Sequence, residues 1–154
     1  MKKQICFFFL GLVCFVSILT TSCVTTTSCI TPPMTTNEID KKKIVDITAK
    51  LDKLQSSGEI KTDFETTLKQ NFDKLSDSNA ALLLFLNAID CYLQRGKIGQ
   101  DIARDMVSVV RARWGAANGL AGTMPTLTPI EQGIIGRSPN SAAIYGRLSE
   151  FGVH

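Results

Sequence analysis

Four helical segments follow one another between residues 37 and 115. Apolar residues recur at steps of three and four along 37–58, 61–77 and 99–114, the spacing of one face of an α-helix. The three apolar stripes are Ile44, Ile47, Leu51 and Leu54; Phe64, Leu68, Phe72 and Leu75; and Ile102, Met106, Val109 and Val110. The stretch 78–95 is instead apolar on almost every side, which is typical of a helix buried among others. We therefore expect it to be the core helix.

Polar residues and glycines predict where these helices begin and end. The expected N-terminal caps are Asn37, Asp77 or Ser78, and a capping box formed by Thr62 and Glu65. Gly115 is expected to end the fourth helix. Beyond it, 116–154 contains several glycines and prolines, a short helix expected at 129–135 and a last helix expected at 140–151. The predicted fold class is all-α: a small bundle of about four helices plus a C-terminal helix.

The N-terminus has the three zones of a secretory signal. Lys2 and Lys3 precede an apolar stretch of about fifteen residues, 5–19, and small polar residues then lead to Cys23. A permanent transmembrane helix usually needs about twenty apolar residues, although an uncleaved signal anchor is the alternative. In both cases the lysines stay in the cytoplasm and the rest of the chain lies outside. We expect residues 1–22 to be a signal peptide.

The end of this signal resembles the lipobox of bacterial lipoproteins. Thr20, Thr21 and Ser22 precede Cys23, although the family pattern has an apolar residue where Thr20 stands. The resemblance implies that Cys23 is acylated, for example with palmitate, and anchors the chain to a membrane. Val24 is not the acidic residue associated with inner-membrane retention, which favours the outer membrane. Ordinary cleavage near Ser22, without a lipid, is the alternative.

Residues 23–36 are expected to form a flexible tether. The stretch 24–36 is rich in threonine and includes Pro32 and Pro33, and such a composition buries little apolar surface. As a flexible chain it would span about 20 Å. Removal of 1–22 takes away two lysines and no acidic residue, so the net charge falls from +3 to +1. A nearly neutral chain gives no electrostatic reason to expect nucleic-acid binding.

Two cysteines remain after the signal and Cys23 are set aside. Cys29 lies in the expected tether, and Cys91 lies on the apolar helix. We expect Cys91 to be a buried free thiol that packs as a small hydrophobic side chain. A Cys29–Cys91 disulfide, which an oxidising compartment would permit, is the alternative.

The sequence gives little support for catalysis. His154 is the one histidine and the last residue, so a general base or a histidine-ligated metal is not expected. We expect no enzyme activity, no cofactor and no metal. A carboxylate pair, Asp90 with Asp101 or Asp105, is the alternative basis for a cell-wall-directed enzyme or glycan binder.

Two groups of residues are candidates for other roles. Asp90 is expected to form a buried polar pair with Arg104, or with Arg111, and so to fix the register of two helices. Arg111, Arg113 and Trp114 are a possible partner contact, because tryptophan and arginine dominate such sites. A tryptophan at the edge of the core with arginines lying over it is the alternative.

The expected function is that of a membrane-anchored, extracytoplasmic helical lipoprotein in the cell envelope, located in the periplasm or on the cell surface. It would act as a protein-interaction or accessory module, bound to the membrane by its lipid and to an envelope protein by its helical domain. An accessory role in a secretion, conjugation or immunity system is a further alternative.

Overall fold

The computed structural model describes residues 28–120 and 126–154. The expected signal peptide, 1–22, and the expected lipidation site, Cys23, lie outside the described residues. The described part contains six α-helices and one short 3-10 helix, and it contains no strand, so the predicted all-α fold is confirmed. The helices are α2 (Glu38–Leu54), α3 (Ile60–Asn71), α4 (Ser78–Gln94), α5 (Gln100–Ala117), α6 (Pro129–Gly136) and α7 (Ser141–Glu150), and the 3-10 helix is Phe72–Lys74.

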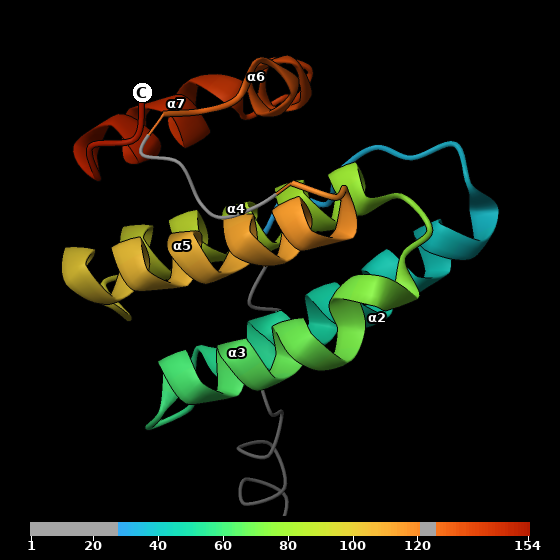
Figure 1. The fold of residues 1–154 in the computed structure, drawn as a ribbon. Helices are drawn as coiled ribbons and strands as arrows, with labels where there is room; N and C mark the ends of the chain where they lie inside the picture. Colours follow the sequence, from blue (N-terminus) through green and yellow to red (C-terminus); the bar gives the residue numbers. More distant parts are fainter. Residues whose placement is uncertain (1–27, 121–125) are drawn as a thin grey trace, which may run out of the picture.

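The helices form three layers. The pair α4–α5 lies in the middle, α2 and α3 pack on one side of it, and α6 and α7 pack on the other (Figure 1). The four helices α2 to α5 are the predicted bundle. The C-terminal helices add a layer that packs against α4 through α7.

The core is centred on α4, as its continuous apolar sequence predicts. Eleven of its residues are buried, on more than one side of the helix. The ring of Phe85 meets the ring of Phe64 edge-on at 5.6 Å, and the hydroxyl of Tyr92 donates to the carbonyl oxygen of Leu51 at 2.7 Å. These contacts fasten α4 to α3 and α2, because aromatic rings bury much area and a buried hydroxyl needs a partner.

Two of the predicted helix starts are confirmed and one is wrong. The side chains of Asn37 and Asp77 accept hydrogen bonds from backbone N–H groups in the first turns of α2 and α4. The predicted capping box of Thr62 and Glu65 does not form, because α3 already begins at Ile60. Ile60 is buried, so packing starts this helix two residues before the polar pair.

The fourth predicted helix also differs in its end and in its inner face. α5 continues through Gly115 to Ala117, since Gly115 is buried in packing. The chain turns away at Gly119, whose φ of 70° is readily adopted only by glycine. Ile102 and Val109 were expected to face the core, yet they are 38% and 37% exposed. The inner residues of α5 are Ala103, Met106, Val107, Val110, Arg111 and Trp114.

Residues 28–36, which we call the strap, lie against the domain and correct the prediction of a flexible tether over this range. Cys29 forms a disulfide with Cys91, and their Cα atoms are 5.5 Å apart, within the usual range for a disulfide. The prediction of a free Cys91 is therefore wrong. The side chain of Ile30 is 2% exposed, and the side-chain amide of Asn87 donates to the carbonyl oxygen of Thr31 at 2.8 Å.

The strap covers one side of α4 that no helix covers completely. Ala80, Leu84, Asn87 and Cys91 are spaced by three and four residues and so share one face of α4. All four are buried, and the strap contacts two of them, Asn87 and Cys91. Figure 1 shows the strap, in blue, passing α4 before α2 begins. The disulfide closes a loop across 62 residues, which by chain entropy alone stabilises the fold by about 4 kcal/mol.

A buried carboxylate joins the start of α2 to the start of α4. Asp40 is fully buried and accepts hydrogen bonds from the backbone N–H groups of Ser76 and Asp77, at 3.1 and 3.0 Å, and from the hydroxyl of Ser76 at 2.8 Å. Burial raises the pKa of Asp40, but the hydrogen bonds from Ser76 and Asp77 outweigh burial and hold the pKa below its ordinary value. The charged form is therefore the one that the fold stabilises.

Because the pKa of Asp40 is lower in the folded chain than the ordinary 3.8, its stabilisation is present above that pH and is lost as the pH falls through the folded value. Asp40→Asn should lower the free energy of unfolding by about 2 kcal/mol near pH 6, since an amide cannot accept all three hydrogen bonds. The difference from the wild type should shrink towards about pH 2.

Urea unfolding followed by circular dichroism across this pH range measures both effects. Asp46→Asn, at an exposed position on the same helix, is the matched control and should behave as the wild type. A loss of stability in Asp40→Asn that stays constant with pH would show that the charge of Asp40 is not the cause.

Candidate functional site

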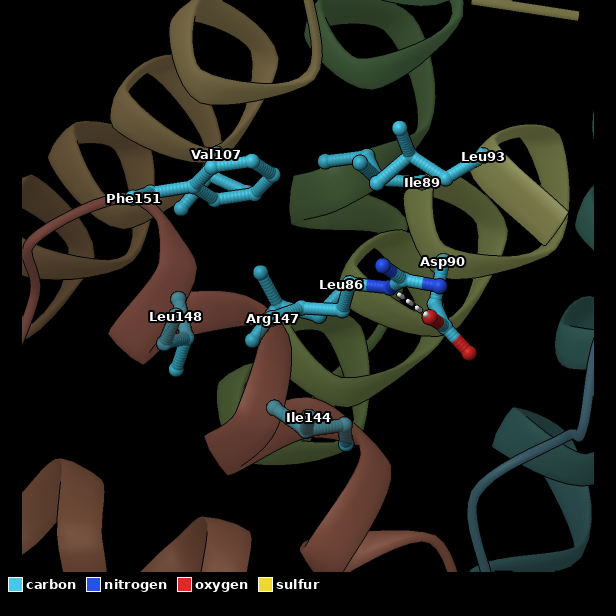
Figure 2. Close-up of a pocket in the computed structure, with 9 residues that line it drawn as sticks. All are labelled: Leu86, Ile89, Asp90, Leu93, Val107, Ile144, Arg147, Leu148 and Phe151. Atoms are coloured by element: carbon cyan, nitrogen blue, oxygen red, sulfur yellow. Dashed lines mark hydrogen bonds and ion pairs between the residues drawn. The ribbon is translucent and has the colours of Figure 1, made fainter. Parts of the chain in front are cut away.

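Asp90, a candidate for a buried polar pair, lies at the junction of α4 and α7. Nε of Arg147 donates to Oδ1 of Asp90 at 3.0 Å, and the side-chain amide of Gln94 donates to the other carboxylate oxygen at 2.5 Å. Figure 2 shows Arg147 reaching from α7 towards Asp90. The side chain of Asp90 is 13% exposed and that of Arg147 is 33% exposed. Hydrogen bonds to the carboxylates of Glu150 and, second, of Asp90 raise the pKa of the Arg147 guanidinium.

The predicted pair of Asp90 and Arg104 is wrong. Arg104 lies 3.8 Å from Asp101, one turn away on the exposed side of α5. Asp90 is on the side of α4 that faces α7, so its partner comes from the C-terminal layer and not from α5. Asp90 lies at the edge of an apolar interface, and its partner depends on which helix packs there, which helical spacing does not report.

The space beneath the Asp90–Arg147 pair is too small for a substrate. Seven apolar side chains from α4, α5 and the C-terminal layer surround it: Leu86, Ile89, Leu93, Val107, Ile144, Leu148 and Phe151 (Figure 2). The free volume for a water-sized sphere is about 10 Å³, room for about one water molecule. This is a packed interface with an ion pair at its edge.

The carboxylate pair considered for glycan hydrolysis is not brought together. Asp105 accepts from Nζ of Lys61, on α3, at 2.7 Å, whereas Asp90 accepts from Arg147, on α7. The helices α3 and α7 lie on opposite sides of the middle layer (Figure 1). Asp101 is fully exposed at the start of α5. The three carboxylates therefore face different surroundings.

Two of the three residues expected to contact a partner are buried. Trp114 is 1% exposed, and its indole N–H donates to Oδ1 of Asn79 at 3.1 Å. Arg111 is 6% exposed. The prediction of a surface contact is wrong for both, because α5 continues past Trp114 and the C-terminal layer covers Arg111. Arg113 is half-buried and forms an ion pair with Asp73 of the 3-10 helix.

Arg111 forms a two-point ion pair with Glu131 of α6. Nε of Arg111 lies 2.8 Å from Oε1 of Glu131, and Nη2 lies 3.1 Å from Oε2 and from the carbonyl oxygen of Thr126. Both side chains are more than nine-tenths buried. Burial raises the pKa of Glu131, but hydrogen bonds from Arg111 and Thr128 outweigh burial and lower the pKa. This pair fastens α6 to α5.

The local sequence around Glu131 contains a signal that the sequence analysis missed. Thr128 caps α6 by accepting from the N–H of Glu131 at 3.2 Å, and Glu131 accepts from the N–H of Thr128 at 2.8 Å. This is a capping box, with Pro129 in the first turn. The box holds the Glu131 carboxylate where Arg111 reaches it. The sequence identified the helix correctly but not the role of its acid.

A polar groove that the sequence analysis did not identify lies where α2 ends. It has a volume of about 200 Å³, and its lining residues are half-buried or exposed: Asp52, Gln55, Ser56, Arg95 and Lys97. Nη1 of Arg95 donates to the side-chain oxygen of Gln55 at 2.8 Å. These residues come from the ends of α2 and α4, which are far apart in sequence, so no local sequence motif predicts the groove.

Within 28–120 and 126–154, no group of three or more His, Cys, Asp or Glu side chains could hold a metal ion. None of the helices in these two ranges has both the length and the apolar character needed to cross a bilayer. The chain matches no protein-family model, no curated protein and no solved structure.

Glu131→Ala should lower the free energy of unfolding by about 3–5 kcal/mol, because it leaves the Arg111 guanidinium buried without its carboxylate. The double substitution Arg111→Met with Glu131→Leu should recover most of this loss, since apolar side chains of similar size fill the same space. Chemical denaturation of these two variants and the wild type measures both effects.

Asp105→Ala is the matched control, because it removes the acid of the exposed Lys61–Asp105 pair and should change stability little. If Glu131→Ala proved as mild as Asp105→Ala, the Arg111–Glu131 pair would not be what fastens α6.

Proposed function

We propose that the protein is a lipid-anchored helical module of the bacterial cell envelope, which lies outside the cytoplasm and acts through contacts with an envelope protein. The observation that carries the proposal is the Cys29–Cys91 disulfide, found directly after an N-terminus with the order of a secretory signal. The two features are independent, since one is read from sequence and the other from the fold.

The disulfide supports the export part of the proposal. Disulfides persist in oxidising compartments such as the periplasm and the cell surface, and are rare where thiols are kept reduced. Cys29 and Cys91 are the two cysteines that follow Cys23, and they pair with each other. After removal of 1–22, which contains Cys6 and Cys14, this pairing leaves Cys23 as the cysteine available for a lipid.

The arrangement of charged groups supports a role in contacts. Three deeply placed acids, Asp40, Asp90 and Glu131, are each engaged by donors from a neighbouring segment. These three acids stabilise the fold, so contacts with other molecules would be made by residues on the surface of the domain. The polar groove at the end of α2 is a concave place on that surface where polar groups of a partner could bind.

The wild-type chain should carry a lipid on Cys23 and sediment with membranes, because the lipobox resemblance makes this cysteine the acylation site. Mass spectrometry of the N-terminal peptide and labelling with a palmitate analogue measure the modification. Cys23→Ser should abolish labelling, whereas Cys14→Ser should leave it unchanged.

Alkylation of thiols at harvest, followed by a non-reducing gel, should show Cys29 and Cys91 already oxidised in cells. Free thiols at both positions would contradict the proposed location outside the cytoplasm. A label that persists in Cys23→Ser would contradict the proposed lipid attachment at Cys23.

The interaction part predicts a partner that meets mainly the anchored form. A photo-cross-linking residue placed at Gln55 or Ser56, beside the polar groove, should capture an envelope protein in cells that produce the wild-type chain. The same residue in a Cys23→Ser chain carrying a cleavable, non-lipid signal should capture much less of it. Equal capture by both forms would mean that the anchor does not bring the partner into reach, and no capture from any exposed position would overturn the interaction role.

A further inference from the structure

We infer that the Cys29–Cys91 disulfide is a clasp that sets the length of the membrane tether. This inference rests on the proposed function, because it takes Cys23 as the point of lipid attachment. The sequence alone makes residues 24–36 a flexible spacer. The structure fastens the strap to α4, so the spacer is reduced to residues 24–28.

The exit of the chain from the domain is defined by a covalent bond. Cys29 is joined to Cys91 in the last part of α4, and Asn87, one turn earlier, binds the carbonyl oxygen of Thr31. Ile30 between them is buried. The strap therefore runs back along α4 towards Asn37, which begins α2 at the other end of the bundle. A pull on the tether would act on Cys91, not on α2.

The clasp changes the reach of the tether by more than a factor of two. Six Cα-to-Cα steps separate Cys23 from Cys29, and at full extension they span about 20 Å. With the strap free, fourteen steps would separate Cys23 from Asn37, and they would span about 50 Å. The disulfide thus holds the domain close to the headgroups, with the side of α4 that carries Cys91 nearest the attachment point.

The covalent bond is needed because the other contacts of the strap are few. Ile30 and Pro33 are its buried side chains, and one side-chain hydrogen bond joins it to α4. Ordering nine residues loses conformational entropy at every residue, which two apolar side chains and one hydrogen bond barely offset. Without the disulfide we expect the strap to detach for much of the time.

The partner that fits this geometry is a protein in the membrane or on its surface. A domain held about 20 Å from its lipid has a small volume to search, which raises its effective concentration at the membrane. Release of the strap would enlarge the volume that the domain can reach and lower the effective concentration of the domain at the membrane.

Energy transfer from Trp114 to the membrane tests the clasp directly. Trp114 is the single tryptophan of the chain and is buried beside Asn79, near the start of α4. The lipidated full chain is placed in phospholipid vesicles that contain a dansyl-labelled phosphatidylethanolamine. Transfer should fall in the double variant Cys29→Ser with Cys91→Ser, and it should also fall when a Gly/Ser segment as long as the strap is inserted after Thr27 in the wild type.

Limited proteolysis separates the clasp from the anchor. In the double serine variant, thermolysin should cleave beside the buried Ile30 of the strap more than about tenfold faster than in the wild type, while α5 remains intact. Circular dichroism checks that the variant is folded. This measurement needs no lipid, so it judges the clasp even if Cys23 proves not to be acylated.

Each outcome decides a separate point. Lower transfer in the insertion variant but unchanged transfer and proteolysis in the serine variant would show that non-covalent contacts hold the strap, and would overturn the clasp. Unchanged transfer in both variants would mean that the domain adheres to the bilayer by its own surface, which also overturns it. A chain that fails to sediment with vesicles would refute the anchor, and with it the tether, whatever the proteolysis shows.

Discussion

The burial of α4 on most of its sides is the constraint on which the rest of the structure depends. A helix with so little polar surface must be covered over most of its circumference, because exposed apolar area is unfavourable in water. α2 and α3 cover one side, α5 covers another, α7 covers a third and the strap covers a fourth, while a narrow stripe with Asn79, Asp90 and Gln94 stays partly exposed. The bundle, the C-terminal layer and the strap therefore all bury the apolar surface of α4. Segments that would be linkers in another protein are structural here.

Polar interactions fix the position of each segment that packs against α4. Apolar contacts are not directional, so they do not by themselves fix a helix in one register. Asp40 fastens α2 to the start of α4, and Arg111 with Glu131 fastens α6 to α5. Arg147 with Asp90 fastens α7 at the far edge of α4. We attribute specificity rather than large net stability to these pairs, since the loss of hydration offsets much of their attraction.

The sequence predicts those features that depend on neighbours in the chain. The stripe of α2, the caps Asn37 and Asp77 and the apolar nature of α4 are read from local spacing, and the structure confirms them. The partner of Asp90 and the burial of Trp114 depend on which segment packs nearby, which periodicity does not report. The strap is the clearest case. Its threonines and prolines are typical of a tether, but one cysteine and one isoleucine suffice to bind it to α4.

The disulfide makes the stability of the fold depend on the redox state of the compartment. The loop that it closes contains all of α2 and α3 and most of α4, so it restricts the unfolded chain over much of the domain. In a reducing compartment the strap would rely on Ile30, Pro33 and one hydrogen bond, and the fold would lack the roughly 4 kcal/mol that loop closure contributes. In an oxidising compartment the disulfide forms and contributes this stabilisation. The strap therefore covers α4 most firmly where disulfides persist, which is the environment to which the proposed N-terminal signal would deliver the chain.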